Sequence, residues 1–276
     1  NFKRKKIIML SDDIRMHSGV AGMAREIVLG TVHKYNWFNI GAAINHPEIG
    51  KVLDISEDVN KQVGIKDSEV RILPSNGYGD AMLLRQVIKE QKPDALFIFT
   101  DPRYWIWLFE IEREIRSKIP IIWYNIWDDY PAPLYNRDYY RSVDSLLAIS
   151  KQTKNINEIV LDGYAEDKLI RYVPHGIDQN IYYPINPDDK EFIKFKKDTL
   201  KGNQYKFVAF FNSRNISRKH PHDLILGYRI FCDRLGKEKA KECALIMHTQ
   251  ITDQHGTDLE ALKEALCDPS YVNLLF

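Results

Sequence analysis

Short apolar runs alternate with amphipathic stretches over the first 180 residues. Runs that are apolar throughout are typical of strands buried on both faces, whereas helices show apolar residues at three- and four-residue steps. The expected strands lie at 6–10, 38–44, 70–73, 95–99, 119–124, 145–149 and 170–173. Helices are expected between them, including one capped by Asp80, one through 105–115 and one capped by Ser150. This alternation predicts β-α-β units and a parallel sheet.

A polar, proline-containing stretch then interrupts the alternation. Residues 181–204 are expected to form a linker with one short helix around 192–197. A second α/β series follows, with strands at 207–211, 244–247 and 272–276 and helices at 224–235 and 259–266. We therefore predict a first domain over 1–180, a linker over 181–204 and a second domain over 205–276. The second domain ends on an apolar strand without covering helices, so we expect it to be incomplete.

Composition and charge exclude several classes of function. The chain is 44% hydrophobic and 28% charged with a formal net charge of +1, so no strong field attracts nucleic acid or an anionic membrane. No apolar run reaches the ~18 residues of a transmembrane segment. The three cysteines lack metal-site spacing and favour a reducing, cytoplasmic compartment. We expect no metal, because no metal-binding motif appears and His220 and His222 make a poor ligand pair, and we expect no cofactor.

The most informative residues follow the first strand of the second series. Arg214, Arg218 and Lys219 lie between the apolar run 207–211 and the next helix. Cations at the end of a parallel strand, beside a helix N-terminus, can bind a diphosphate. A solvated basic loop is the competing interpretation, and the spacing alone does not decide between the two.

This stretch resembles the start of the second domain in glycogen-synthase-like retaining glycosyltransferases, the glycosyl transferases of group 1. That family has a strand, a small residue, an arginine, four further residues and a lysine, and Ser213, Arg214 and Lys219 match the pattern. Ser213 and His220 replace the glycines that usually flank it. The resemblance implies that Arg214 and Lys219 are catalytic, since in the family they hold the donor diphosphate and offset the charge of the leaving group. Ser213 and Arg218 would contact the donor.

Two further segments carry the same resemblance. Residues 173–178, Val-Pro-His-Gly-Ile-Asp, are similar to the segment that closes the family's first domain. His175 within it is expected to be structural first, with a hydrogen bond to the acceptor as the alternative. Residues 18–22 resemble the glycine-containing loop after the first strand, which implies that Gly19 and Val20 approach the donor. They do not form the dinucleotide fingerprint, which disfavours a nicotinamide cofactor.

Acceptor-side residues are harder to assign, because no histidine stands where the family often has one. Asp101 and Asp129 follow expected strands and are candidates for binding sugar hydroxyls. Trp127 and Tyr130 lie in a proline-rich loop and could form an acceptor-side wall. Turn formation and core packing are the competing interpretations.

The resemblance implies an α/β protein of the GT-B type, with two Rossmann-like domains and parallel sheets. It implies a UDP- or GDP-linked sugar donor, transfer with retention, no metal, and a carbohydrate, lipid or protein acceptor. The family's Glu-x7-Glu segment is not found after Lys219, which favours a truncated second domain. A sugar-nucleotide epimerase of the same architecture and a non-catalytic nucleotide-binding protein remain as alternatives.

Overall fold

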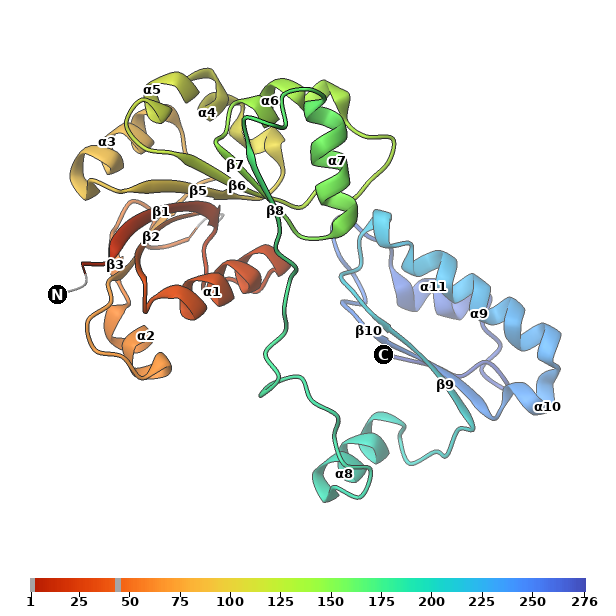
Figure 1. The fold of residues 1–276 in the computed structure, drawn as a ribbon. Coiled ribbons are helices and arrows are strands. Elements are labelled where there is room, and N and C mark those ends of the chain that lie inside the picture. Colours follow the sequence, from red (N-terminus) through yellow and green to blue (C-terminus); the bar gives the residue numbers. More distant parts are fainter. Residues whose placement is uncertain (1–2, 43–45) are drawn as a thin grey trace. The chain divides into compact units, whose positions relative to one another are not determined.

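The computed structural model describes residues 3–42 and 46–276 (Figure 1). Contacts divide the chain into two compact units, Asn1–Asp178 and Gln179–Phe276. The segment 181–204, predicted to be a linker, falls in the second unit. In the described part of the chain, no helix is long and apolar enough to cross a membrane.

The first unit is built on one eight-stranded sheet of order β3-β4-β2-β1-β5-β6-β7-β8. Every neighbouring pair is parallel except β3 with β4. The predicted parallel sheet is therefore confirmed, although residues 43 and 44 of the expected strand 38–44 lie outside the described residues. The strands are β1 (Lys5–Asp12), β2 (Tyr35–Ala42), β3 (Leu53–Asp54), β4 (Val70–Ser75), β5 (Ala95–Phe99), β6 (Ile121–Asn125), β7 (Ser145–Ala148) and β8 (Leu169–Tyr172).

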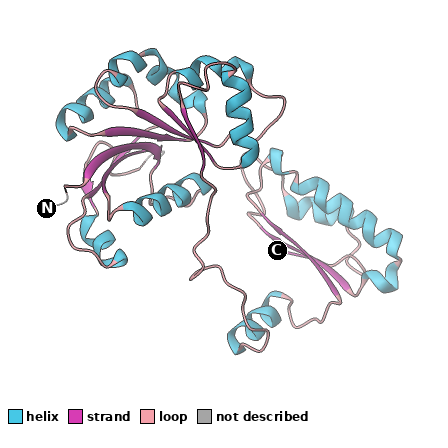
Figure 2. Ribbon diagram, viewed as in Figure 1, coloured by secondary structure: helices cyan, strands magenta, loops and turns pink. Residues whose placement is uncertain are grey.

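Helices cover both faces of this sheet (Figures 1 and 2). Because successive side chains of a strand point to opposite faces, Ile8 of β1 packs in one core cluster with Leu84 and Ile156, and Met9 packs in another with Val28 and Val59. The helices are α1 (Gly19–Thr31), α2 (Ser56–Val63), α3 (Ala81–Gln91), α4 (Ile106–Glu110), α5 (Glu112–Arg116), α6 (Arg137–Arg141) and α7 (Lys151–Leu161), with 3-10 turns η1 (Pro102–Trp105) and η2 (Leu134–Asn136).

Local chemistry explains where these helices begin. Asp80 accepts hydrogen bonds from the backbone N–H groups of Met82 and Leu83 at 2.8 and 2.9 Å, and Ser150 accepts one from Thr153 at 2.9 Å. Both predicted caps are thus confirmed. The prediction of a single helix through 105–115 is wrong, because η1, α4 and α5 occupy this stretch. Ile111, between α4 and α5, lies outside helical geometry at φ −108° and ψ 13°. The helices α2 and α6 were not predicted from the sequence.

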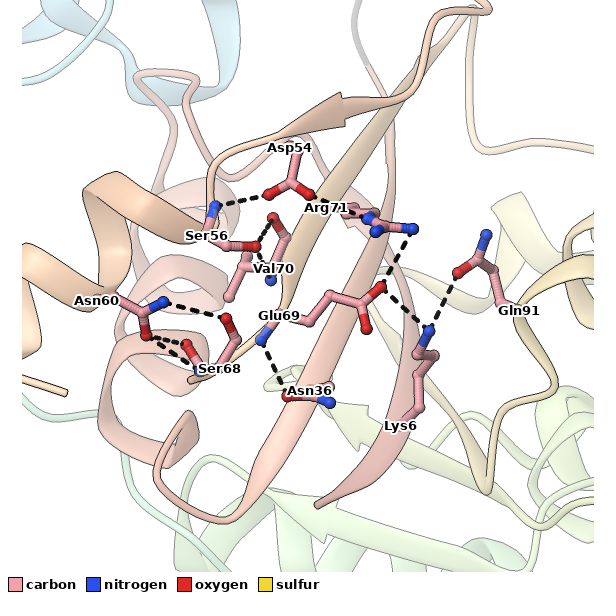
Figure 3. Close-up of polar contacts among 10 residues, drawn as sticks. All are labelled: Lys6, Asn36, Asp54, Ser56, Asn60, Ser68, Glu69, Val70, Arg71 and Gln91. Atoms are coloured by element: carbon pink, nitrogen blue, oxygen red, sulfur yellow. Dashed lines mark hydrogen bonds and ion pairs between the residues drawn. The ribbon is translucent and has the colours of Figure 1, made fainter. Parts of the chain in front are cut away.

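A charged network ties the elements together near the amino ends of the strands (Figure 3). The Lys6 ammonium lies 3.1 Å from a Glu69 carboxylate oxygen and 3.3 Å from the Gln91 side-chain oxygen. Arg71 contacts Glu69 and Asp54, both at 3.2 Å. These pairs join β1, β3, β4 and the end of α3, so this edge of the sheet is occupied by structural contacts.

The second unit contains a parallel three-stranded sheet of order β11-β10-β9. Its strands are β9 (Phe207–Asn212), β10 (Cys243–His248) and β11 (Leu274–Leu275), the last shorter than the strand expected at 272–276. Its helices are α8 (Lys190–Thr199), α9 (Pro221–Leu235), α10 (Lys237–Ala240) and α11 (Leu259–Leu266), with the turn η3 (Ser217–Lys219). The main core joins α9 and α11 to β10 and includes Ile225, Tyr228, Leu245 and Leu259.

Cys232, Cys243 and Cys267 are free and buried in the second unit. Burial raises the pKa of all three thiols, so little thiolate is present at neutral pH. We expect each native thiol to react with a disulfide reagent at pH 8 more slowly than glutathione, since burial limits access to the sulfur and lowers the thiolate fraction. Denaturant should equalise the rates, and a fast-reacting native thiol would contradict this prediction.

Candidate functional site

The strongest candidate site lies on the loop between β9 and α9, residues 213–220, called here the basic loop. Arg214 extends from it to Asp253, which lies after β10. The Arg214 Nε lies 2.7 Å from one Asp253 carboxylate oxygen, and Nη2 lies 3.3 Å from the other. The Asp253 side chain is 3% exposed and the Arg214 side chain 58% exposed. The hydrogen bond from Arg214 lowers the pKa of Asp253, so the pair stays charged at neutral pH.

Asn215 fastens the basic loop to residues 249–258, called here the facing loop. Asn215 is fully buried. Its Nδ2 donates to the carbonyls of Ile251 at 3.2 Å and Thr257 at 2.6 Å, and its Oδ1 accepts from the Thr257 N–H at 3.2 Å. Gly256 is required here, because a Cβ would lie 2.2 Å from the Asn215 carbonyl oxygen. The two loops therefore form one rigid surface at the carboxyl edge of the sheet.

The other cations of the basic loop are exposed. Arg218 and Lys219 lie on η3, and within the described residues neither side chain has a hydrogen-bond or ion-pair partner. His220 follows with φ +48°, a left-handed conformation that favours glycine. The resemblance implies a glycine at this position, and His220 has a backbone conformation of the kind that glycine readily adopts. Pro221 then begins α9, whose N-terminus adds partial positive charge beside the cations.

The facing loop and Arg214 enclose a shallow hollow. Half-buried Ser213 precedes Arg214 at the end of β9. The hollow is lined by Arg214, Gln250, Ile251, Thr252, Asp253 and Gln254. At the strand ends beside it, a His248 ring nitrogen lies 3.0 Å from the Asn212 side-chain oxygen. The predicted donor-side residues of this unit therefore lie on one loop, next to a recess whose lining combines polar residues with Ile251.

A group of metal-ligating side chains lies beside this loop. His220 and His222 lie 3.2 and 3.6 Å from the Asp223 carboxylate, and their ligand atoms lie within 4.8 Å of one another. The second ring nitrogen of His222 is buried without a hydrogen-bond partner. Metal-binding histidines normally have that nitrogen hydrogen-bonded, so the group fits an ion-paired helix start better than a metal site.

In the first unit, the predicted glycine loop lies at the carboxyl end of β1. Gly19 and Val20 are the first two residues of α1, and no atom lies within 4 Å of the position that a Gly19 Cβ would take. Ser18 caps the helix by accepting a hydrogen bond from the Ala21 N–H at 2.9 Å. The start of the helix is thus exposed at Gly19, and an approach of Gly19 and Val20 to the donor stays a prediction.

Asp12 and Tyr78 lie beside this loop and were not predicted from the sequence. The Ser18 hydroxyl donates to one Asp12 oxygen, and the Tyr78 hydroxyl donates to the other at 2.6 Å. The Tyr78 ring lies 4.4 Å from that of Tyr104 and 5.2 Å from that of Trp105. Burial and the Asp12 carboxylate raise the pKa of Tyr78 well above its usual range, so it stays a hydrogen-bond donor. In the sequence, the glycines on either side of Tyr78 were the feature that could have pointed to this residue.

The two acidic acceptor-side candidates, Asp101 and Asp129, differ in whether their carboxylates are hydrogen-bonded within the described part of the protein. Asp101 caps η1 by accepting from the Arg103 N–H at 2.9 Å, and its two oxygens lie 2.9 and 2.8 Å from the Arg103 guanidinium. This is the turn role that competed with hydroxyl binding. Asp129 is exposed, and its carbonyl accepts a hydrogen bond from the Trp127 indole at 3.2 Å.

Trp127 and Tyr130 hold the proline-rich loop against α7. The Trp127 carbonyl accepts a hydrogen bond from Thr153 at 2.8 Å, and its half-buried ring packs against the core. The Tyr130 hydroxyl accepts one from Asn155 at 2.9 Å, while the residue as a whole is 47% exposed. Tyr130 therefore presents an aromatic surface, whereas much of Trp127 serves the fold.

His175 packs at the carboxyl end of the central strands. Its ring lies 6.0 Å from Phe99 and 5.4 Å from Tyr124, each edge to face, and the Tyr124 hydroxyl donates to the Val173 carbonyl at 2.7 Å. Partial burial lowers the pKa of His175, so the ring is neutral at pH 7. These ring contacts are of the kind that a structural role requires, and that role of His175 stays a prediction.

Comparisons with known proteins identify the fold. No family model matches the chain, and no curated protein matches its sequence. Among solved structures, the α,α-trehalose-phosphate synthase (UDP-forming) of Burkholderia vietnamiensis is 11% identical with a TM-score of 0.58, covering 99% of this chain and 73% of that one. A glycosyltransferase from Rickettsia africae is 13% identical with a TM-score of 0.61, covering 99% and 68%.

A third neighbour is the UDP-GlcNAc 2-epimerase of Neisseria meningitidis bound to UDP-GlcNAc. It is 12% identical with a TM-score of 0.54, covering 98% of this chain and 72% of that one. The fold is of the GT-B type. At these identities the similarity concerns the fold, and it confirms the predicted pair of Rossmann-like domains with parallel sheets.

Proposed function

We propose that this chain is a glycosyltransferase that moves a sugar from a nucleotide-diphosphate sugar to an acceptor, with retention. The observation that carries the proposal is the basic loop, where Arg214, Arg218 and Lys219 follow a parallel strand beside a helix N-terminus. In open α/β sheets, ligands bind at this carboxyl edge. The neighbouring Burkholderia enzyme is named as UDP-forming, which supports UDP as the donor nucleotide over GDP.

Charge compensation is the chemical role of the basic loop in this proposal. Transfer breaks the bond between the sugar's anomeric carbon and a diphosphate oxygen, and the electron pair leaves with the nucleotide. The leaving diphosphate gains negative charge, which the Arg214 guanidinium and the Lys219 ammonium would stabilise. These two cations take the part that a divalent metal fills in other phosphate chemistry. The acceptor remains a carbohydrate, a lipid or a protein.

The alanine variants of Arg214 and Lys219 test this proposal. Each removes a charged hydrogen-bond donor, and we expect each to weaken UDP binding by about 1.5–3 kcal/mol, or about 10- to 150-fold. Calorimetric titration of UDP measures the effect. Lys219→Ala should leave the melting temperature unchanged because Lys219 is exposed, whereas Arg214→Ala should lower it because Asp253 loses its partner.

Arg234→Ala is the matched control, since Arg234 is an exposed arginine in the last turn of α9, away from the basic loop. It should bind UDP as the parent chain does. Parent affinity in both Arg214→Ala and Lys219→Ala would exclude the basic loop as the diphosphate site.

A sugar-nucleotide epimerase is the second candidate, which the fold similarity to the Neisseria epimerase favours. Incubation with UDP-N-acetylglucosamine separates the two activities. An epimerised nucleotide sugar identifies an epimerase, whereas release of UDP that depends on an added acceptor identifies a transferase. Tight UDP binding without either product would identify a non-catalytic nucleotide-binding protein.

A further inference from the structure

We propose that Asp253 is a positioning residue that orients the Arg214 guanidinium toward the donor diphosphate. The inference rests on the proposed function, since it concerns how the basic loop binds its anion. It assigns a role to a carboxylate that lies 39 positions from its partner arginine in the chain.

Asp253 is itself held in place. Its side chain is 3% exposed, and one carboxylate oxygen accepts the His255 N–H at 2.9 Å. The facing loop that carries it is fixed by the three hydrogen bonds of Asn215. Asp253 is therefore a rigid acceptor whose position is determined by the fold rather than by Arg214.

Arg214, in contrast, needs a partner to hold one direction. Its side chain is 58% exposed, and a free arginine side chain loses rotamer entropy when it binds a ligand. Contacts of Nε and Nη2 with the two carboxylate oxygens fix both the direction and the plane of the guanidinium. Part of that entropy is then lost on folding, before any nucleotide binds.

The pairing leaves one edge of the guanidinium available. Among the described residues, Nη1 of Arg214 has no hydrogen-bond acceptor. Donors on this edge can reach a phosphate oxygen while the opposite edge stays on Asp253. Arg218 and Lys219, which have no ion-pair partner among the same residues, supply the net positive charge that attracts the anion.

Two explanations of the role of Asp253, orientation of Arg214 and a contribution to the net charge of the loop, predict opposite changes in UDP affinity. Removing the negative charge of Asp253 makes the loop more positive, so a purely electrostatic site would bind UDP more tightly. If Asp253 orients Arg214, the same change releases the guanidinium and weakens binding. The sign of the change in affinity therefore tests the assignment.

The experiment is a double-mutant cycle read by UDP calorimetry. Asp253→Asn keeps an oxygen that can accept the His255 N–H and removes the charge that holds Arg214. We expect it to weaken UDP binding about tenfold in the parent chain. In the Arg214→Ala background it should change the affinity by less than about twofold, because the residue it orients is gone. A merely structural role would weaken binding equally in both backgrounds.

Asp198→Asn, which changes an exposed aspartate on α8, is the matched control and should leave UDP binding unchanged. Equal or tighter UDP binding by Asp253→Asn overturns the assignment, as does an equal loss in both backgrounds. Failure of the parent chain to bind UDP refutes the proposed function instead, so the two failures are distinguishable.

Discussion

The Asn215→Ala variant is expected to lose about 3 kcal/mol or more of the free energy of unfolding of the second unit, because several buried polar groups would be left unpaired at 1–3 kcal/mol each. The wild-type amide donates to two carbonyls and accepts one N–H within a fully buried site. Alanine leaves all of these groups without that partner. The basic loop should then detach from the facing loop, so UDP binding should fall as well.

Thiol accessibility measures this loss, because all three cysteines lie buried in the second unit. Their reaction with a disulfide reagent should become faster in Asn215→Ala and require less denaturant. Asn203→Ala is the matched control, since the exposed Asn203 side chain donates a single hydrogen bond, to the Leu200 carbonyl at 3.1 Å. Its effect should stay near 1 kcal/mol. Parent stability and parent UDP affinity in Asn215→Ala would show that the two loops are held by other contacts.

Most strands of both units were predictable because buried parallel strands carry a strong local signal. The run 95–99 is apolar at every position and becomes the central strand β5, with all five residues buried. The helix caps Asp80 and Ser150 were predictable for a similar reason, because a cap needs only the backbone N–H groups two or three residues further along the chain. Whether a segment forms a strand or a helix could therefore be predicted from residues that are close together in the sequence.

The contacts of the candidate site were not predictable in the same way. Arg214 was identified from its place after β9, but nothing local indicates that Asp253 binds it 39 positions later. Polar residues after a strand are equally typical of turns. The available signal was topological: β9 and β10 are parallel neighbours, so the loops after them meet at one edge. In the first unit, Tyr78 follows β4 and Asp12 ends β1, and β2 lies between these two strands, so pairing of neighbouring strands alone does not bring Tyr78 to Asp12.

The break in the helix expected through 105–115 has a different cause. Trp105, Leu108 and Ile115 are buried and repeat at helical spacing, so periodicity alone favours one helix. The turn η1 begins instead at Pro102, with Asp101 accepting the Arg103 N–H, and the backbone leaves helical geometry at Ile111. A periodic apolar pattern marks the buried face of a segment but does not show where its helical turns begin and end.

A glycine in the first unit carries the last prediction. Gly41 lies in β2, paired with Ser11 of β1 and Pro74 of β4. An added Cβ would lie 2.6 Å from the Cα of Asp13 and 2.9 Å from the side-chain oxygen of Asn39. Neither neighbour can move freely, because Asp13 is 1% exposed and Asn39 accepts the Ile14 N–H at 3.2 Å. The backbone of the segment after β1 must shift to admit a methyl group.

Gly41→Ala should therefore lower the free energy of unfolding of the first unit by about 3 kcal/mol or more, at the upper end of overpacking effects. Tryptophan fluorescence in denaturant reports this unit alone, since all five tryptophans lie within it. Gly30→Ala is the matched control: no atom lies within 4 Å of its added Cβ, and alanine in helix α1 should be neutral or stabilise by about 0.5–1 kcal/mol. Because the strain falls on the segment that leads to Ser18 and Gly19, Gly41→Ala should also disturb the N-terminus of α1. An unfolding midpoint equal to that of the parent chain would mean that Asp13 can yield to a methyl group, contrary to its burial.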